Sequence, residues 1–270
     1  MSVQRPHDRS PSEAAGAPGM TSPNAAAANA HVRPFVHDAG HTRALHFSIC
    51  AVQSRLDLRH PDRLDLEYTR LMMAFLLLQP QPAHIGMVGL GGGSLARFCR
   101  RHLPAARIQV AENNPHVIAL REQFLVPPDG PQFGVLQADG AAFVREAAGT
   151  LDVLLVDGFD ADGLPRSLSS QRFFDDCAGA LRPGGVLAMN IHTDAERQAK
   201  VLERLRRSFG GVALAVKDSD GTNHVVFACQ GDGLSALRPG ARPPKLDADA
   251  AGTLQGAFTR VLSAWKGEFS

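Results

Sequence analysis

The chain has 270 residues, with 28 Lys and Arg against 27 Asp and Glu, so its formal net charge is +1. This balance argues against a general nucleic-acid or membrane-surface binder, because both need a basic surplus. The hydrophobic share of 44% is typical of a globular protein, and no stretch has the length of a membrane span. The four cysteines stand far apart without a C-x-x-C pair, which predicts free thiols in a reducing cytoplasm and no zinc site.

The N-terminal part of the chain changes character at about residue 34. Residues 1–33 are rich in Ala, Pro, Ser and Gly, a composition that predicts a disordered tail. Residues 41–58 mix β-branched, aromatic and polar side chains and predict one or two strands of a small β-hairpin. Residues 64–78 carry apolar side chains at helical spacing and predict a helix. We expect a small β and helix region over residues 34–82.

From His84 the sequence alternates between short apolar strands and helices. The expected strands are 84–89, 107–111, 133–137, 151–156, 186–191, 212–216 and 224–229, and the expected helices are 94–102, 115–124, 140–147, 169–181 and 194–209. Repeated β-α units of this length predict a doubly wound α/β sheet of Rossmann type over residues 83–232. No helix separates the last two strands, so we expect an antiparallel last strand. A C-terminal extension over 233–270 is expected to carry a surface helix at 253–265.

A glycine-rich turn joins the first strand of this sheet to its first helix. Gly89, Gly91 and Gly93 let the backbone turn tightly and approach a ligand at the N-terminus of the helix. Glu112 follows at the end of the second strand, where a carboxylate can bind both hydroxyls of a ribose. These features predict a nucleoside ligand. The turn also fits the NAD fingerprint except at Ser94, which takes the place of the third glycine.

Other features favour the sheet type that binds S-adenosylmethionine. Asp139 follows the third strand, where an acid can accept a hydrogen bond from an adenine amino group, although it also suits the N-cap of the next helix. Residues 181–187 form a turn that is common before the fifth strand of methyltransferase-like sheets. Asp157 ends the fourth strand, where ligands of open α/β sheets bind. A carboxylate there can attract a cationic amine and take a proton from it.

The sequence resembles the spermidine/spermine synthase family, the polyamine aminopropyltransferases, over roughly residues 35–230. The resemblance is carried by Gln53, Tyr68 and residues 88–94, 112–115, 137–140 and 156–160. It implies a methyltransferase-like fold, often in a homodimer, and a small-molecule amine substrate. The implied reaction transfers an aminopropyl group from decarboxylated S-adenosylmethionine to a diamine such as putrescine and needs no metal.

The resemblance also implies roles for individual residues. By position, the nucleoside cofactor would contact Gln53, Gly89, Gly91, Gly93, Glu112, Asp139 and Gly140. Asp157 would hold and deprotonate the attacking amine, and Tyr68 and Asp160 would help to position it.

Several positions depart from the family pattern. Gly92 stands where the family has an Asp that helps to bind the aminopropyl amine, and Thr69 and Arg70 follow the tyrosine. Arg70 would repel a diamine if it pointed into the site. Alternatives to the aminopropyltransferase are therefore an S-adenosylmethionine-dependent methyltransferase, favoured by the missing acid, and a nucleoside-binding protein without catalysis. A nicotinamide-dependent dehydrogenase is a more distant fourth.

Overall fold

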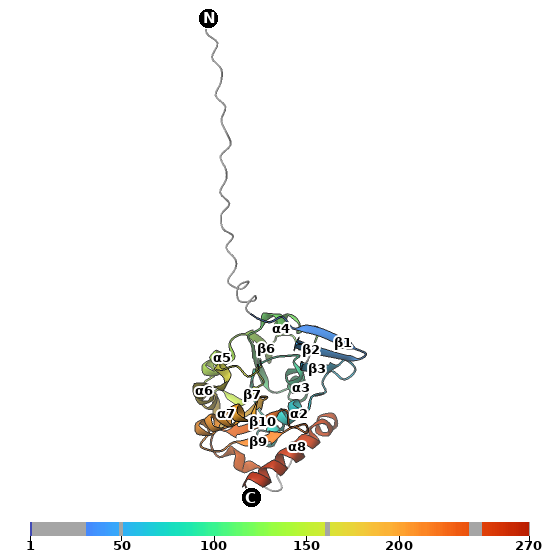
Figure 1. Cartoon of the computed structure of the whole chain (residues 1–270). Helices are drawn as coiled ribbons and strands as arrows, with labels where there is room; N and C mark the ends of the chain where they lie inside the picture. The colour runs from blue at the N-terminus through green and yellow to red at the C-terminus, as the bar shows by residue number, and fades with distance from the viewer. Residues whose placement is uncertain (2–30, 49–50, 160–162, 238–244, 270) are drawn as a thin grey trace.

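A computed structural model of the chain describes Met1 and residues 31–48, 51–159, 163–237 and 245–269. A small β-sheet near the N-terminus sits beside a larger central sheet, and the C-terminal helix α8 (Ala248–Phe269) lies along the opposite side of the molecule (Figure 1). The tail predicted over residues 1–33 lies mostly outside the described residues. No helix within the described ranges is long and apolar enough to cross a membrane.

The small sheet contains three antiparallel strands rather than the one or two expected. They are β1 (Phe35–Ala39), β2 (Thr42–Ser48) and β3 (Ala51–Asp57), paired in that order. β1 has no clear signal in the sequence, because this edge strand is mostly exposed and lacks an apolar alternation. The helix that follows is also shorter than expected: α2 covers Glu67–Met72, and the buried residues Met73–Leu77 form the 3-10 turn η1.

The central sheet has the doubly wound topology that the sequence predicts. Its strands are β4 (His84–Val88), β5 (Arg107–Glu112), β6 (Phe133–Gln137), β7 (Leu151–Val156), β8 (Leu181–Ile191), β9 (Leu214–Lys217) and β10 (His224–Cys229). Their order is β6-β5-β4-β7-β8-β10-β9. The last strand in sequence, β10, is antiparallel to both β8 and β9, between which it lies. The strand order reverses between β4 and β7, so these two strands flank the point where such sheets bind ligands.

The helices cover both faces of this sheet. They are α3 (Ser94–His102), α4 (Pro115–Ala119), α5 (Gly140–Glu146), η2 (Ser167–Ser169), α6 (Gln171–Ala180), α7 (Ala195–Ser208), η3 (Gly233–Ala236) and α8. The expected helix at 115–124 is cut to α4, and turns lead from it to Val126. β8 begins directly after α6, so the predicted turn over residues 181–187 lies within the strand.

The C-terminal helix differs from the surface helix expected over residues 253–265. α8 extends well beyond residues 253–265, and it is more than a surface helix, because it buries Ala250, Leu254, Phe258 and Val261 against the core. It packs on α2, η1 and β9.

Alternate residues of β8 show how the sheet separates two apolar layers. Val186 and Ala188 belong to the layer that also includes side chains of α2, η1, α3 and α8, whereas Leu187 and Met189 belong to the layer of α6 and α7. Because side chains alternate along a strand, Asn190 falls on the first face. This polar side chain therefore lies on the same side of the sheet as α2.

Candidate active site

The glycine turn after β4 requires backbone conformations that favour glycine. Gly89, Gly91 and Gly93 all have positive φ angles, of 92°, 50° and 70°. A Cβ atom on Gly89 would lie 2.3 Å from the carbonyl oxygen of Asp157, because the ends of β4 and β7 are in contact there. A Cβ on Gly91 would meet only Ser54 Cβ, at 3.9 Å. The turn is thus closely packed at Gly89 and open at Gly91, where a ligand could approach the backbone.

Replacing Gly89 with Ala is therefore expected to destabilise the protein. The new methyl group must move the backbone of Asp157, and the positive φ of residue 89 adds strain. We therefore expect the free energy of unfolding to fall by about 2–4 kcal/mol. Urea unfolding followed by circular dichroism measures this change. The matched control is Gly179→Ala in α6, where nothing lies within 4 Å of the new atom. An equal effect of the two substitutions would contradict the close contact between Gly89 and the backbone of Asp157.

Glu112 fastens the turn to the end of β5. Its Oε2 accepts a hydrogen bond of 2.9 Å from the backbone N–H of Leu90, and its Oε1 accepts one of 2.8 Å from the N–H of Asn114. The residue is only 8% exposed. The two backbone donors fix the orientation of the carboxylate, and each oxygen keeps a lone pair for a further donor. Two adjacent acceptors in this arrangement match the two hydroxyls of a ribose.

Asp139 and Gly140 lie at the N-terminus of α5, next to the turn. Asp139 caps the helix, since its Oδ1 accepts a hydrogen bond of 2.9 Å from Ala142 N–H. Its side chain is exposed, so it can also reach a ligand. A Cβ on Gly140 would lie 2.4 Å from Val88 Cγ1. The ends of β4 and α5 therefore approach as closely as a glycine permits.

Asp157, Tyr68 and Asn190 form a hydrogen-bonded group at the end of β7. Asp157 Oδ1 accepts a 3.0 Å hydrogen bond from Asn190 Nδ2. The hydroxyl of Tyr68, from α2, also bonds to the Asp157 carboxylate. The backbone N–H of Asp157 donates to Val88 O at 2.9 Å, which ties this group to the glycine turn.

The surroundings of this group favour a proton acceptor. Burial raises the pKa of Asp157, although the hydrogen bonds from Asn190 and Tyr68 oppose that rise. Burial, and then the charge of Asp157, raise the pKa of Tyr68 well above its usual value. Tyr68 therefore stays protonated and donates its hydrogen to the carboxylate. A carboxylate with a raised pKa is a stronger base than an ordinary aspartate.

Asn190 is the site residue that sequence reasoning missed. It is 3% exposed, and its Oδ1 has no hydrogen-bond partner within the described part of the chain. Buried polar groups without partners are rare and often lie at functional sites. A sequence-level indication existed, because Asn190 is the one polar residue in the apolar stretch 186–191.

Gln53 and Asp160 are the two remaining site residues that the sequence predicts. Leu45 pairs with Ser54 and His46 pairs with Val52, so Gln53 is the extra residue of a β-bulge in β3. Bulges commonly redirect a side chain next to a functional site. Asp160 lies outside the described residues.

The two departures after Tyr68 do not disturb the Asp157 group. Thr69 Oγ1 donates to Leu66 O at 2.6 Å. The Arg70 guanidinium donates to the carbonyl oxygens of Leu64 and Asp65 at 2.7 and 2.9 Å. The charge of Arg70 is thus held by the segment before α2.

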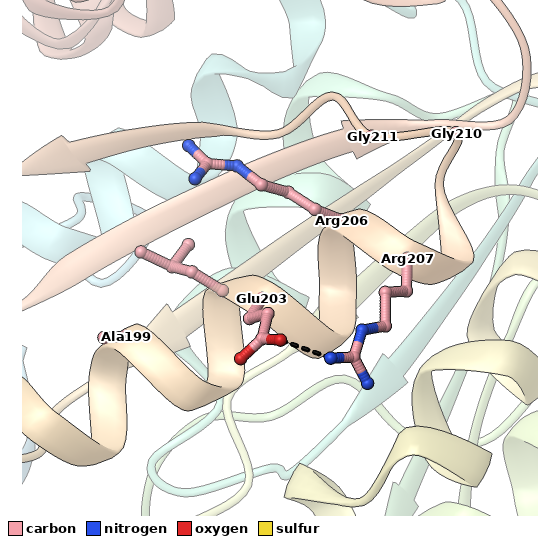
Figure 2. A pocket seen from close by; sticks show the side chains of 7 residues that line it. Ala199, Glu203, Arg206, Arg207, Gly210 and Gly211 are labelled. Atoms are coloured by element: carbon pink, nitrogen blue, oxygen red, sulfur yellow. Dashed lines mark hydrogen bonds and ion pairs between the residues drawn. The ribbon is translucent and has the colours of Figure 1, made fainter.

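A surface hollow of about 470 Å³ lies elsewhere, along the C-terminal half of α7 (Figure 2). Gly210 and Gly211 border it and lead into the edge strand β9, whereas Asp157 follows the central strand β7. Its Glu203 pairs with Arg207, and Arg206 binds Glu268 at 2.9 Å. Its charges therefore already have partners. Among the described residues, no group of three or more His, Cys, Asp or Glu could hold a metal ion.

The family model and the most similar curated relatives name one family. The family model described as "Spermine/spermidine synthase domain" matches residues 66–218. The chain is 39% identical over 194 residues to a polyamine aminopropyltransferase of Chromobacterium violaceum, covering 72% of this chain and 74% of that protein. It is 38% identical to a polyamine aminopropyltransferase of Neisseria meningitidis serogroup A, covering 72% and 75%. A probable spermidine synthase from Corynebacterium glutamicum has a similar fold, with a TM-score of 0.64 at 18% identity, covering 83% and 91% of the two chains.

Proposed function

The chain belongs to the spermine/spermidine synthase family, and we propose that it transfers an aminopropyl group from decarboxylated S-adenosylmethionine to a diamine such as putrescine. It is a transferase, as its relatives are. The observation that carries the proposal is the group formed by Asp157, Tyr68 and Asn190 beside a glycine turn held by Glu112. It combines a proton acceptor with a nucleoside site at the same edge of the sheet.

The nucleoside half of the donor fits the residues around the turn. Glu112 would bind the ribose hydroxyls with the free lone pairs of its two oxygens, and Asp139 would accept a hydrogen bond from the adenine amino group. Gly89, Gly91 and Gly93 would let the ligand approach the backbone, and Gln53 and Gly140 would border it. The open space beyond Gly91 supports this assignment, since a side chain there would fill it.

The reacting amine belongs next to Asp157. When bound, the donor supplies an electrophilic carbon attached to a sulfonium, which is an excellent leaving group. A diamine is cationic in water and becomes a nucleophile only after one nitrogen loses a proton. Asp157 would accept that proton, while the hydroxyl of Tyr68 and the amide of Asn190 hold the carboxylate in place. Orientation and one proton acceptor then supply most of what the reaction needs.

The cellular location, the oligomeric state, the role of Asp160 and the domain boundaries remain predictions. Cys99, Cys177 and Cys229 are free and buried, which supports a reducing cytoplasmic location. Cys50 lies outside the described residues. The homodimer, the contribution of Asp160 and the domain boundaries after residues 33, 82 and 232 are proposed on the sequence alone.

An assay of donor preference tests the function. With putrescine present, we expect release of methylthioadenosine from decarboxylated S-adenosylmethionine, and calorimetry should show tighter binding of that donor than of S-adenosylmethionine. Release of S-adenosylhomocysteine with generic methyl acceptors would instead identify a methyltransferase. Nucleoside binding without turnover across a panel of diamines would identify a binding protein and overturn the proposal.

A further inference from the structure

Arg97, in the first turn of α3, is a buried cation. The residue is only 3% exposed. Its guanidinium donates to four oxygens: Gly92 O, Phe124 O at 2.6 Å, Pro61 O at 2.9 Å and Ser94 Oγ at 3.3 Å. No carboxylate is bonded to it within the described residues, and backbone carbonyls supply most of its contacts. Such an arrangement is costly to build, because burying a charge is unfavourable unless it is well bonded.

These carbonyls belong to three segments that are distant in sequence. Pro61 lies between β3 and α2, Gly92 lies in the glycine turn, and Phe124 follows α4. Burial lowers the pKa of Arg97 to about 10, so the side chain is still charged near neutral pH. A planar guanidinium can bind several carbonyls in fixed directions at once, which a lysine ammonium cannot do as rigidly.

β3 and the segment after α4 also pack closely against the glycine turn. A Cβ atom on Gly92 would lie 2.5 Å from Ser54 Oγ and 3.0 Å from Phe124 Cδ1. A Cβ on Gly93 would lie 2.4 Å from Val126 Cγ2. The position of the turn therefore depends on how the small sheet and the segment after α4 are held, and Arg97 binds the backbone on both sides of it.

We infer that Arg97 is a positioning residue for the nucleoside donor, which it serves by holding the Gly92 carbonyl in register with the segments at Pro61 and Phe124. The inference rests on the proposed function, since it takes the glycine turn as the donor site. Arg97 is bonded to neither Asp157 nor Tyr68, so its loss should weaken donor binding more than it slows the step at Asp157.

Methylthioadenosine binding and steady-state kinetics test this role. We expect that in Arg97→Lys the glycine turn keeps its binding geometry only about a tenth of the time. The Kd of methylthioadenosine and the KM of the donor should then rise about tenfold. The kcat at saturating donor should stay within about twofold of the wild-type value, because the Asp157 group is intact. In Arg97→Ala, millimolar guanidinium should restore part of the lost affinity by entering the vacated space.

The matched control is Arg101→Ala, one turn further along α3, where the side chain is 68% exposed. It should bind methylthioadenosine like the wild type. A wild-type Kd in folded Arg97→Lys would overturn the inference. The inference would also be overturned if guanidinium raised the melting temperature of Arg97→Ala without changing its Kd for methylthioadenosine. Arg97 would then contribute to stability alone. Failure of the wild type itself to bind methylthioadenosine would instead refute the proposed function.

Discussion

Asp157→Asn is expected to lower kcat for aminopropyl transfer by about 10²–10⁴-fold, the range that a positioned general base contributes. The amide has nearly the same shape and still accepts the hydrogen bond from Asn190 Nδ2. It does not accept a proton from the amine. Because the glycine turn and Glu112 are untouched, the Kd of methylthioadenosine should stay close to the wild-type value.

Single-turnover rates and calorimetry on the same preparation separate these two effects. The control is Asp176→Asn in α6, which lies away from the carboxyl edge of the sheet and pairs with Arg172. Full activity of Asp157→Asn would remove Asp157 from the mechanism. Loss of nucleoside affinity in parallel with kcat would mean that the carboxylate shapes the binding site as well.

The stability of Asp157→Asn reports the direction of the pKa shift. Burial raises the pKa of Asp157, so the fold disfavours its ionised form. The wild type therefore loses stability relative to the variant as pH rises through that raised pKa. Urea unfolding should show the free energy of unfolding of the variant rising relative to that of the wild type as pH increases to 7, with this relative gain absent on the acid side of the ordinary aspartate value.

The convergence of the residues proposed to bind the nucleoside was predictable, because it follows from local sequence patterns. The turn at Gly89, Gly91 and Gly93 lies between one strand and one helix, and Glu112 ends the next strand. The order of β and α elements alone then brings these residues to one edge, since parallel strands share their carboxyl ends. Asp139 and Asp157 follow by the same rule.

The contacts that join separate segments were not predictable in this way. Asn190 bonds to Asp157 across 33 positions, and Arg97 bonds to Pro61 and Phe124 across 36 and 27. Arg97 stands close to Arg100 and Arg101, and such a run alone indicates a solvent-exposed helix face. Arg97 is nevertheless buried, with the glycine turn and the segment after α4 packed around it. The bulge at Gln53 depends on the pairing register of β2 and β3, which no local pattern specifies.

Glu112→Gln is expected to weaken methylthioadenosine binding by about 10–100-fold, equivalent to losing one or two bonds to a charged acceptor. Both carboxylate oxygens accept from backbone N–H groups, of Leu90 and Asn114. An amide has only one oxygen, so its NH₂ group must face one of these donors and repel it. The ribose acceptor and the anchor of the turn are then lost together.

Calorimetry with methylthioadenosine measures the affinity, and urea unfolding measures the accompanying loss of stability, which we expect to be about 1–3 kcal/mol. Glu146→Gln, at the exposed end of α5, is the matched control and should change neither. Wild-type affinity in a folded Glu112→Gln protein would place the ribose elsewhere. Because Glu112 does not touch Asp157, its loss should raise the KM of the donor while kcat at saturation falls less, the opposite of the pattern expected for Asp157→Asn.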